Sequence, residues 1–293
     1  MDHYVVAGNP VEHSQSPFIH TEFARQTGQA MDYGRVLWPL GGFDDSLRAL
    51  VASGAKGCNI TVPFKFDAFR AARHLTPRAA LAQAANVLRF DAAGWLADNT
   101  DGAGLVGDIE RNAGLALAGK RVLLIGAGGA AAGVLGPLLA AGAREVVVAN
   151  RTLEKAQALV ERHAALAGAA VLLAREPGDA GVAFDVVVNA TASSLQGAAV
   201  PVPHSVLAPG TLALDMMYGA AAQPFLDWAA AQGATGRDGL GMLVEQAAEA
   251  FALWRGVRPA TAPVLAALRE RMALAAGRTE AQARSQASAR AER

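Results

Sequence analysis

The sequence lacks several features that mark particular classes of protein. It has one cysteine, Cys58, which excludes an internal disulfide bond and a cysteine-based metal cluster. Its six histidines are scattered without the spacing of a zinc site, so no metal ion is expected. Basic and acidic residues number 26 each, and this zero net charge gives no reason to expect a nucleic-acid partner or a membrane-surface partner.

Long apolar runs are also missing from the chain. No window holds about 18 unbroken apolar residues, the length that a membrane-spanning helix needs. Asp2 and His3 stand where a signal peptide would carry basic residues, and no long apolar stretch follows them. We therefore expect a soluble, cytoplasmic protein without a membrane partner.

The composition is that of a folded protein with a sizeable core. The chain has 293 residues, 52% of them hydrophobic and 18% charged, and this length favours two domains. From Lys120 onward, short apolar segments alternate with alanine-rich segments, a pattern typical of a parallel α/β sheet. The expected strands of this sheet are residues 122–125, 145–149, 170–173, 185–189 and 212–215.

The segment after the first of these strands has the spacing G-x-G-x-x-A, at Gly126, Gly128 and Ala131. This spacing is typical of a dinucleotide-binding turn, in which the first glycine permits a tight turn and the second lets the backbone approach a pyrophosphate. The amide groups that open the following helix would face the phosphates. A merely flexible glycine-rich turn is the alternative, but the strands on both sides favour nucleotide binding.

The second of these strands ends in Asn150, Arg151 and Thr152. An NAD site usually has an acidic residue here, about 20 residues beyond the glycines, and this chain has none. Arg151, with Lys155 one helical turn later, instead favours a 2′-phosphate and therefore NADP. An ordinary surface arginine is the alternative.

Two serines precede the first expected helix, over residues 18–27. Because Pro17 suits the first turn of a helix, Ser16 is a candidate N-cap. Together with Ser14 it could also hold a carboxylate at the helix N-terminus. From this segment alone, capping is the favoured interpretation.

A strand expected over residues 57–63 places Asn59 and Thr61 on one face, because side chains alternate along a strand. Lys65 lies just beyond, where a helix begins. Only four lysines occur among the 26 basic residues, and lysine, unlike arginine, can be tuned to lose its proton. A solvated residue at a helix start is the alternative for Lys65.

The polar segment 98–102 leads into a long helix expected to run to Gly114. Asp101 is well placed to cap this helix, and a functional role is compatible with capping. Further on, a helix is expected over residues 263–276, whereas residues 278–293 have no apolar stripe.

Several motifs together resemble those of the shikimate dehydrogenase family. They are NPVEHSQSPFIH at 9–20, NITVPFK at 59–65, DNTDG at 98–102, GAGGAA at 126–131, NRT at 150–152, NAT at 189–191 and DGLGMLVEQA at 238–247. The match runs in order from about Val5 to Pro263, which chance does not explain.

The resemblance implies an α/β fold with an N-terminal substrate domain, a Rossmann-type NADP-binding domain and C-terminal helices that pack back on the first domain. The boundaries would be 1–101 with 238–276 for the substrate domain, 102–237 for the NADP-binding domain and 277–293 for a flexible tail. It also implies an activity, the reversible NADPH-dependent reduction of 3-dehydroshikimate to shikimate in aromatic amino acid biosynthesis.

The resemblance further implies two sets of site residues. The substrate site would comprise Ser14, Ser16, Asn59, Thr61, Lys65, Asn86, Asp101, Tyr218 and Gln246. The NADP site would comprise Gly126, Ala127, Gly128, Gly129, Ala130, Asn150, Arg151, Thr152, Lys155, Thr191, Met216, Gly239 and Met242.

The chain departs from the family pattern at two places. Val87 follows Asn86 where threonine is typical. Ala-Ser-Ser-Leu follows Thr191 where a glycine is common, so the cofactor contacts near Ser193 stay open. Neither change replaces a group that the chemistry needs.

The residue types suit this chemistry. Serine, threonine, asparagine and glutamine can pair with ring hydroxyls as donors and acceptors. Hydride transfer to a ketone leaves an alkoxide that must gain a proton, for which Lys65 is the candidate acid, oriented by Asp101. A nearby carboxylate raises the pKa of a lysine and burial lowers it, so the reverse assignment, with Asp101 as the proton carrier, stays open.

Two other functions are compatible with the sequence. The substrate could be quinate as well as shikimate, or the chain could be a catalytically silent sensor of NADPH or shikimate. The presence of both Lys65 and Asp101 argues against the sensor, which needs no proton-transfer pair. A homodimer is possible, and the sequence does not decide the oligomeric state.

Overall fold

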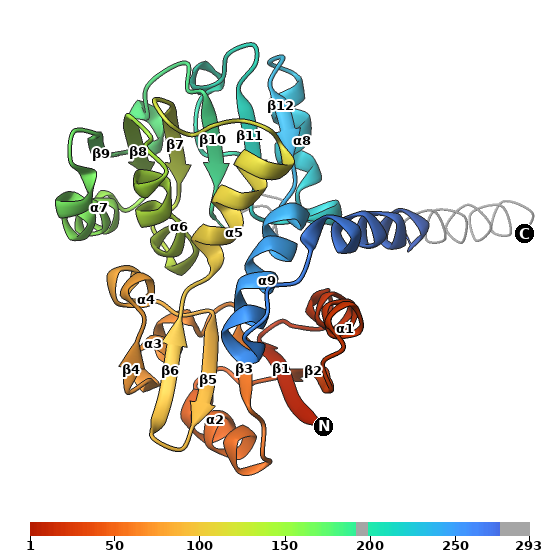
Figure 1. The fold of residues 1–293 in the computed structure, drawn as a ribbon. Helices are drawn as coiled ribbons and strands as arrows, with labels where there is room; N and C mark the ends of the chain where they lie inside the picture. Colours follow the sequence, from red (N-terminus) through yellow and green to blue (C-terminus); the bar gives the residue numbers. More distant parts are fainter. Residues whose placement is uncertain (192–198, 276–293) are drawn as a thin grey trace, which may run out of the picture.

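The chain forms two lobes, each built around its own sheet, in a computed structural model that describes residues 1–191 and 199–275 (Figure 1). The sequence-based expectations for the neighbourhood of Ser193 and for the tail 277–293 lie outside these residues. Within them, no helix has the length and apolar character needed to cross a membrane.

The first lobe contains a mixed six-stranded sheet in the order β2-β1-β3-β5-β6-β4. β1 pairs in parallel with β2 and β3, whereas β5 is antiparallel to both β3 and β6. The strands are β1 (Asp2–Gly8), β2 (Met31–Leu37), β3 (Gly57–Ile60), β4 (His74–Leu75), β5 (Val87–Asp91) and β6 (Gly94–Asp98). The helices of this lobe are α1 (Ser16–Thr27), α2 (Phe43–Ala52), α3 (Lys65–Ala71) and α4 (Pro77–Ala82).

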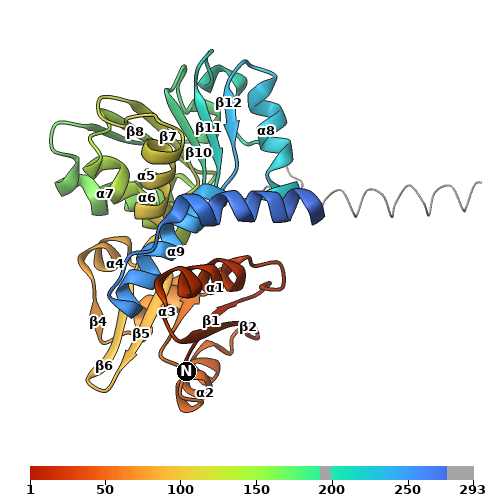
Figure 2. The same cartoon turned by 45° about the vertical axis from the view of Figure 1, so that its right-hand side comes forward.

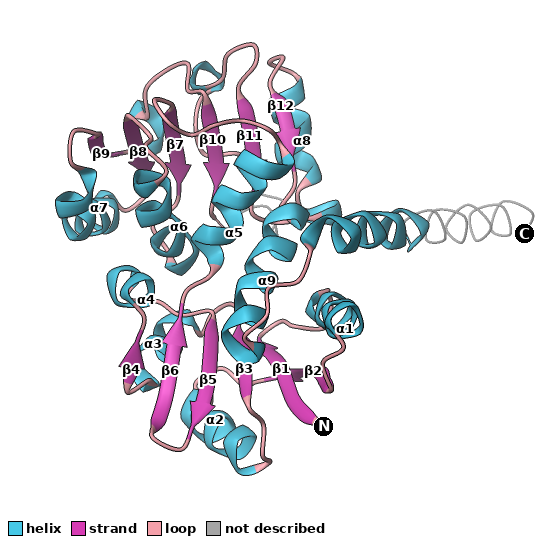
Figure 3. Ribbon diagram, in the orientation of Figure 1, coloured by secondary structure: helices cyan, strands magenta, loops and turns pink. Residues whose placement is uncertain are grey.

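The second lobe contains a parallel six-stranded sheet in the order β12-β11-β10-β7-β8-β9 (Figure 3). Its inner strands contain runs of valine and leucine that are buried, as expected of a sheet covered on both faces. The strands are β7 (Arg121–Ile125), β8 (Glu145–Ala149), β9 (Val171–Arg175), β10 (Val186–Asn189), β11 (Leu212–Asp215) and β12 (Thr235–Arg237). The helices are α6 (Gly129–Ala140), α7 (Leu153–Ala167) and α8 (Gln223–Ala230).

The predicted α/β architecture is confirmed, with some boundaries corrected. The strand expected over 57–63 ends at Ile60, and the sequence analysis missed the short edge strand β12. The helix expected to run to Gly114 is α5 (Asp101–Gly107) followed by a π-helical segment (Asp108–Asn112). Asp101 is therefore the first residue of α5 rather than its N-cap, which is Thr100.

Two helices join the lobes, α5 and α9 (Leu240–Arg255), which pack against each other (Figure 1). A glycine lets them approach closely, because a Cβ added at Gly104 would lie 2.7 Å from the carbonyl oxygen of Met242. The first turn of α9 therefore lies where the chain passes between the sheets.

The C-terminal helices pack back on the first lobe, as the sequence predicts. Val244 and Phe251 of α9 form one buried cluster with Ile19 and Phe23 of α1. The helix over residues 261–275 adds Leu268 to this cluster and then extends away from the body of the molecule (Figure 2).

Candidate functional site

A cavity of about 1150 Å³ lies between the two lobes. Every residue that the sequence analysis assigned to the substrate site or the NADP site lines this cavity. The residues come from segments up to 232 positions apart in the chain, from Ser14 to Gln246, so the fold brings together what the motifs only suggested. The parallel sheet contributes the carboxyl ends of its strands, where ligands bind in α/β folds.

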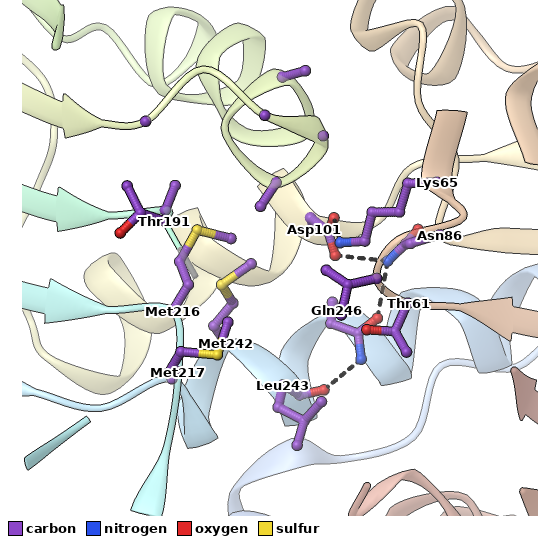
Figure 4. A pocket seen from close by; sticks show the side chains of 18 of the residues that line it. Thr61, Lys65, Asn86, Asp101, Thr191, Met216, Met217, Met242, Leu243 and Gln246 are labelled. Carbon is purple, nitrogen blue, oxygen red and sulfur yellow. Dashed lines mark hydrogen bonds and ion pairs between the residues drawn. The ribbon is translucent and has the colours of Figure 1, made fainter. Parts of the chain in front are cut away.

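Lys65 and Asp101 form an ion pair on the wall of the cavity (Figure 4). The Lys65 Nζ lies 2.6 Å from Asp101 Oδ2, and the two side chains are 14% and 7% exposed. Lys65 is the first residue of α3 and Asp101 the first of α5, so two helix starts meet here. A primary amine held by a carboxylate at a nearly closed site can exchange a proton with a bound oxygen.

An amide network holds the other oxygen of Asp101. Asn86 Nδ2 donates to Asp101 Oδ1 at 2.8 Å and to Gln246 Oε1 at 3.1 Å. Asn86 Oδ1 accepts from the backbone amide of Thr100 at 2.8 Å, and Gln246 Nε2 donates to the carbonyl oxygen of Leu243 at 2.8 Å. Figure 4 shows this chain of contacts crossing from α5 to α9. The network leaves both carboxylate oxygens of Asp101 with a donor before any ligand binds.

The two serines lie at the start of α1, and their roles there differ from the prediction. Ser16 is the first residue of the helix, and the N-cap is Gln15 without a side-chain capping bond. The hydroxyl of Ser14 instead accepts the amide of Ser16 at 3.3 Å, so the expected N-cap role of Ser16 is wrong. The two hydroxyl groups are 3.2 Å apart on the cavity wall.

Tyr218 reaches this loop from the second lobe, beyond the end of β11. Burial raises the pKa of Tyr218, while the backbone of Gln15 and the charge of Arg35 act in the opposite direction. The phenol therefore keeps its proton near neutral pH and can donate a hydrogen bond into the cavity. Hydroxyl groups from both lobes thus meet at this end of the site.

Asn59 and Thr61 line the cavity although only Asn59 belongs to β3. The backbone amide of Thr61 donates to the carbonyl oxygen of Ala7, which holds the residue against β1. Gly8 makes room for it, because a Cβ there would lie 2.2 Å from Thr61 Cγ2. The shared face expected from strand alternation is thus replaced by a turn that still presents both side chains.

The glycine turn lies at the carboxyl end of β7, on the opposite wall. Gly126 has φ of +110°, a conformation that favours glycine, and Gly128 is the N-cap of α6. A Cβ added at Gly129 would be 3.5 Å from Lys65 Cβ, so the turn lies beside the stem of the Lys65 side chain, and both line the cavity. Backbone amides at a helix start suit the pyrophosphate of a dinucleotide.

Positive charge lines the neighbouring part of the cavity. Arg151 follows β8 and Lys155 lies on α7, and both side chains are exposed. In the described part of the chain neither forms an ion pair, and Asp101 is the sole carboxylate among the lining residues. These cations suit a phosphate group on the adenosine ribose, which fits NADP rather than NAD.

Three methionines line the wall between the two halves of the site. Met216 and Met217 follow β11, Met242 is on α9, and Thr191 follows β10 (Figure 4). Gly239 permits this arrangement, since a Cβ there would lie 2.4 Å from the carbonyl oxygen of Met216. The result is an apolar wall, which suits the ring of a nicotinamide.

The sequence analysis missed several residues that line the cavity. Met217 follows the predicted residue Met216 and lies in no quoted motif, whereas Leu243 lies in the motif at 238–247 but was not assigned to the site. Arg162 of α7 lines the cavity and donates to the carbonyl oxygen of Ala82 in the first lobe at 3.1 Å. Its position seven residues after Lys155 puts it on the same helix face, which is the one signal that could have found it.

Comparison with protein families matches three regions of the chain. Residues 6–88 match the shikimate dehydrogenase substrate binding domain, and residues 109–197 match shikimate/quinate 5-dehydrogenase. Residues 239–269 match the shikimate 5′-dehydrogenase C-terminal domain.

Similar proteins cover nearly the whole chain. The chain is 64% identical to shikimate dehydrogenase (NADP(+)) of Methylibium petroleiphilum, over 92% of this chain and 94% of that protein. It is 61% identical to the shikimate dehydrogenase (NADP(+)) of Acidovorax sp. (strain JS42), over 94% of this chain and 98% of that protein.

Solved structures agree with these relatives. The Ael1 enzyme of Pseudomonas putida has a TM-score of 0.83 at 46% identity, covering 92% of this chain and 98% of its own. Shikimate 5-dehydrogenase of Thermus thermophilus was solved in complex with NADP(H) and shikimate. It has a TM-score of 0.79 at 29% identity, covering 92% of this chain and 99% of its own. With matching domains in both lobes and relatives of such identity, this chain belongs to the shikimate dehydrogenase family.

Proposed function

We propose that the chain catalyses the reversible NADPH-dependent reduction of 3-dehydroshikimate to shikimate. One observation carries the proposal: the amine of Lys65, paired with Asp101, and the glycine turn of a dinucleotide site line a single cavity. The relatives that carry this name cover more than nine-tenths of the chain. The pathway is the synthesis of aromatic amino acids.

The second lobe offers groups that fit NADP. The amides opening α6 would hold the pyrophosphate, and Arg151 with Lys155 would hold the 2′-phosphate. Met216 and Met242 would flank the nicotinamide. When bound, NADPH supplies the hydride.

The first lobe offers groups that fit the substrate. Ser14, Ser16 and Tyr218 gather at one end of the cavity, where hydroxyl donors beside the start of α1 would hold the carboxylate. The hydroxyls of the ring would pair with Asn59, Thr61, Asn86 and Gln246, whose amides and hydroxyl line the same wall.

The proton would move at the Nζ of Lys65. During reduction the ammonium group donates to the oxygen that becomes the new hydroxyl, and in the reverse direction the amine takes the proton back. Asp101 holds the ammonium in place at 2.6 Å and is itself held by Asn86. Asp101 would therefore orient the proton donor, because both its oxygens are already engaged by donors.

The experiment is an absorbance assay at 340 nm with shikimate or quinate and with NADP or NAD. We expect NADPH formation with shikimate. The matching family description also includes quinate, and the ratio of kcat/KM for the two acids measures which of them is the preferred substrate. A flat trace with all four combinations, despite calorimetric binding of shikimate, would favour a silent sensor and refute the proposal.

Three further assignments belong to the same proposal. The substrate domain would comprise 1–101 and 238–276 and the NADP-binding domain 102–237, which agrees with the end of β12 at Arg237 and the start of α9 at Leu240. We expect the protein in the cytoplasm, where cell fractionation would find it. A homodimer is possible, and light scattering would measure it.

A further inference from the structure

Tyr33 lies behind the substrate wall rather than on it. It belongs to β2, the edge strand of the first sheet, and it is outside the set of described residues that line the cavity. Its hydroxyl donates to Oδ1 of Asn59 at 2.6 Å. Asn59 does line the cavity, so Tyr33 contacts a substrate-site residue from the rear.

Two contacts together fix the orientation of the Asn59 amide. The Nδ2 of Asn59 donates to the backbone carbonyl oxygen of Asn86 at 3.2 Å. A carbonyl oxygen can only accept, so the amide nitrogen must face Asn86 and the amide oxygen must face Tyr33. Tyr33 thereby engages the amide oxygen, and Nδ2, which carries two hydrogens, uses one of them for Asn86 on the wall of the cavity.

Tyr33 is itself held firmly by its surroundings. Its ring stacks on that of His20, with centroids 4.2 Å apart and planes 8° from parallel. Burial raises the pKa of Tyr33 well above its ordinary value, with a further contribution from Cys58, and the hydroxyl of Ser16 acts in the opposite direction. The phenol therefore keeps its proton and remains a donor near neutral pH.

A second contact from the same strand supports this role for β2. Arg35, two residues later and thus on the same face as Tyr33, donates to the carbonyl oxygen of Ser14 at 2.7 and 3.0 Å. One face of β2 thereby holds both Asn59 and the loop of Ser14, two cavity-lining residues from different segments.

We propose that Tyr33 is a positioning residue for the substrate, which fixes Asn59 as a hydrogen-bond donor to a ring oxygen. The inference rests on the proposed function and adds a requirement on the substrate, which must present an acceptor at this point of the cavity. Tyr33 would act through Asn59 and would not touch the substrate itself.

The test compares Tyr33→Phe with the matched control Tyr4→Phe. Tyr4 lies directly opposite Tyr33 on the neighbouring strand, and its hydroxyl interacts with Arg255 instead of the substrate wall. We expect Tyr33→Phe to lower kcat/KM for shikimate about 3- to 10-fold, the loss of one neutral hydrogen bond, through KM. The KM for NADP stays unchanged, as do both constants in the control.

A double-mutant cycle with Asn59→Ala separates positioning from general damage. If Tyr33 acts through Asn59, Tyr33→Phe causes no further loss in the Asn59→Ala background. Calorimetric affinity for shikimate gives the same comparison where turnover is slow.

Three outcomes overturn the inference while the wild-type chain remains active. They are an unchanged KM for shikimate in Tyr33→Phe, an equal rise in the KM for NADP, and the same loss in the presence and absence of Asn59. Failure of the wild-type chain to oxidise shikimate would instead refute the proposed function.

Discussion

The two walls of the cavity are built on different principles. On the substrate wall, Asn86, Asp101 and Gln246 are buried, and Asn86 is hydrogen-bonded to both of the others. On the cofactor wall, the binding groups are a backbone turn and the exposed cations Arg151 and Lys155. One wall is joined by hydrogen bonds before a ligand arrives, and the other presents backbone amides and long side chains.

The difference follows from what each wall must recognise. A ring with several hydroxyls can be told from its isomers only by donors and acceptors of fixed direction, so the amides need partners behind them. A phosphate group accepts hydrogen bonds from many directions, so backbone amides and flexible cations are sufficient to bind it. Changes on the substrate wall should therefore alter chemistry and substrate affinity, and changes on the cofactor wall should alter the choice of cofactor.

The largest expected effect is on the substrate wall, from Lys65→Ala. Removing the proton donor should lower kcat about 10²- to 10⁴-fold with a small change in KM, because the amine acts on the transition state. Steady-state kinetics with shikimate and NADP measure it. The control is Lys56→Ala, a lysine of the same lobe that is exposed and away from the cavity. A Lys65→Ala enzyme with normal kcat would remove Lys65 from the mechanism.

The next largest effect is expected on the cofactor wall, from Arg151→Ala. Arg151→Ala should lower kcat/KM for NADP about 10- to 100-fold, the loss of a charged hydrogen bond, and leave that for NAD nearly unchanged. Arg144→Ala is the control, since Arg144 is exposed on the same lobe before β8 and does not line the cavity. Equal losses with both cofactors would refute the role of Arg151 in binding the 2′-phosphate.

The smallest expected effect is on the pH dependence of stability. Each lobe has one buried histidine, and the two should contribute to this dependence by different amounts. Burial lowers the pKa of His20 to about 3, partly opposed by Asn59, and no hydrogen bond forms at either ring nitrogen in the described part of the chain. His163 of the second lobe is also buried, but its Nδ1 lies 2.9 Å from the carbonyl oxygen of Leu159. Burial lowers its pKa as well, and that backbone contact acts in the opposite direction.

The sign of the pH effect follows from these directions. The folded state keeps His20 neutral, whereas the unfolded chain takes up a proton below its ordinary pKa of 6.5. The contribution of His20 to the free energy of unfolding is therefore fully present above about pH 6.5 and is lost as the pH falls towards 3. The loss reaches about 2 kcal/mol at about pH 5. Urea unfolding at several pH values measures this slope.

His20→Phe should remove most of this slope, and His163→Phe should remove less of it. The slope, rather than the absolute stability, is the readout, because either substitution can also disturb packing. An unchanged slope in His20→Phe would show that other groups cause the acid sensitivity.

Much of the fold could be predicted because its signals are local. Neighbouring positions in the sequence were enough to predict the apolar strands between Arg121 and Asp215, the glycine turn, and the basic residues after β8. The exceptions were ends and edges. Ser16 lies inside α1 rather than at its cap, because Ser14 accepts its amide, and β12 is too short and polar to show periodicity.

The sequence by itself determined the α/β class, the family and the types of residue at the site, since strand periodicity, turn chemistry and motif spacing are properties of short segments. Only the tertiary structure decided how those residues are oriented. Asn86 meets Gln246 from 160 positions away, and Tyr33 meets Asn59 from 26 positions away. A hydrogen bond depends on the direction of both partners, and that direction is set when distant segments pack together.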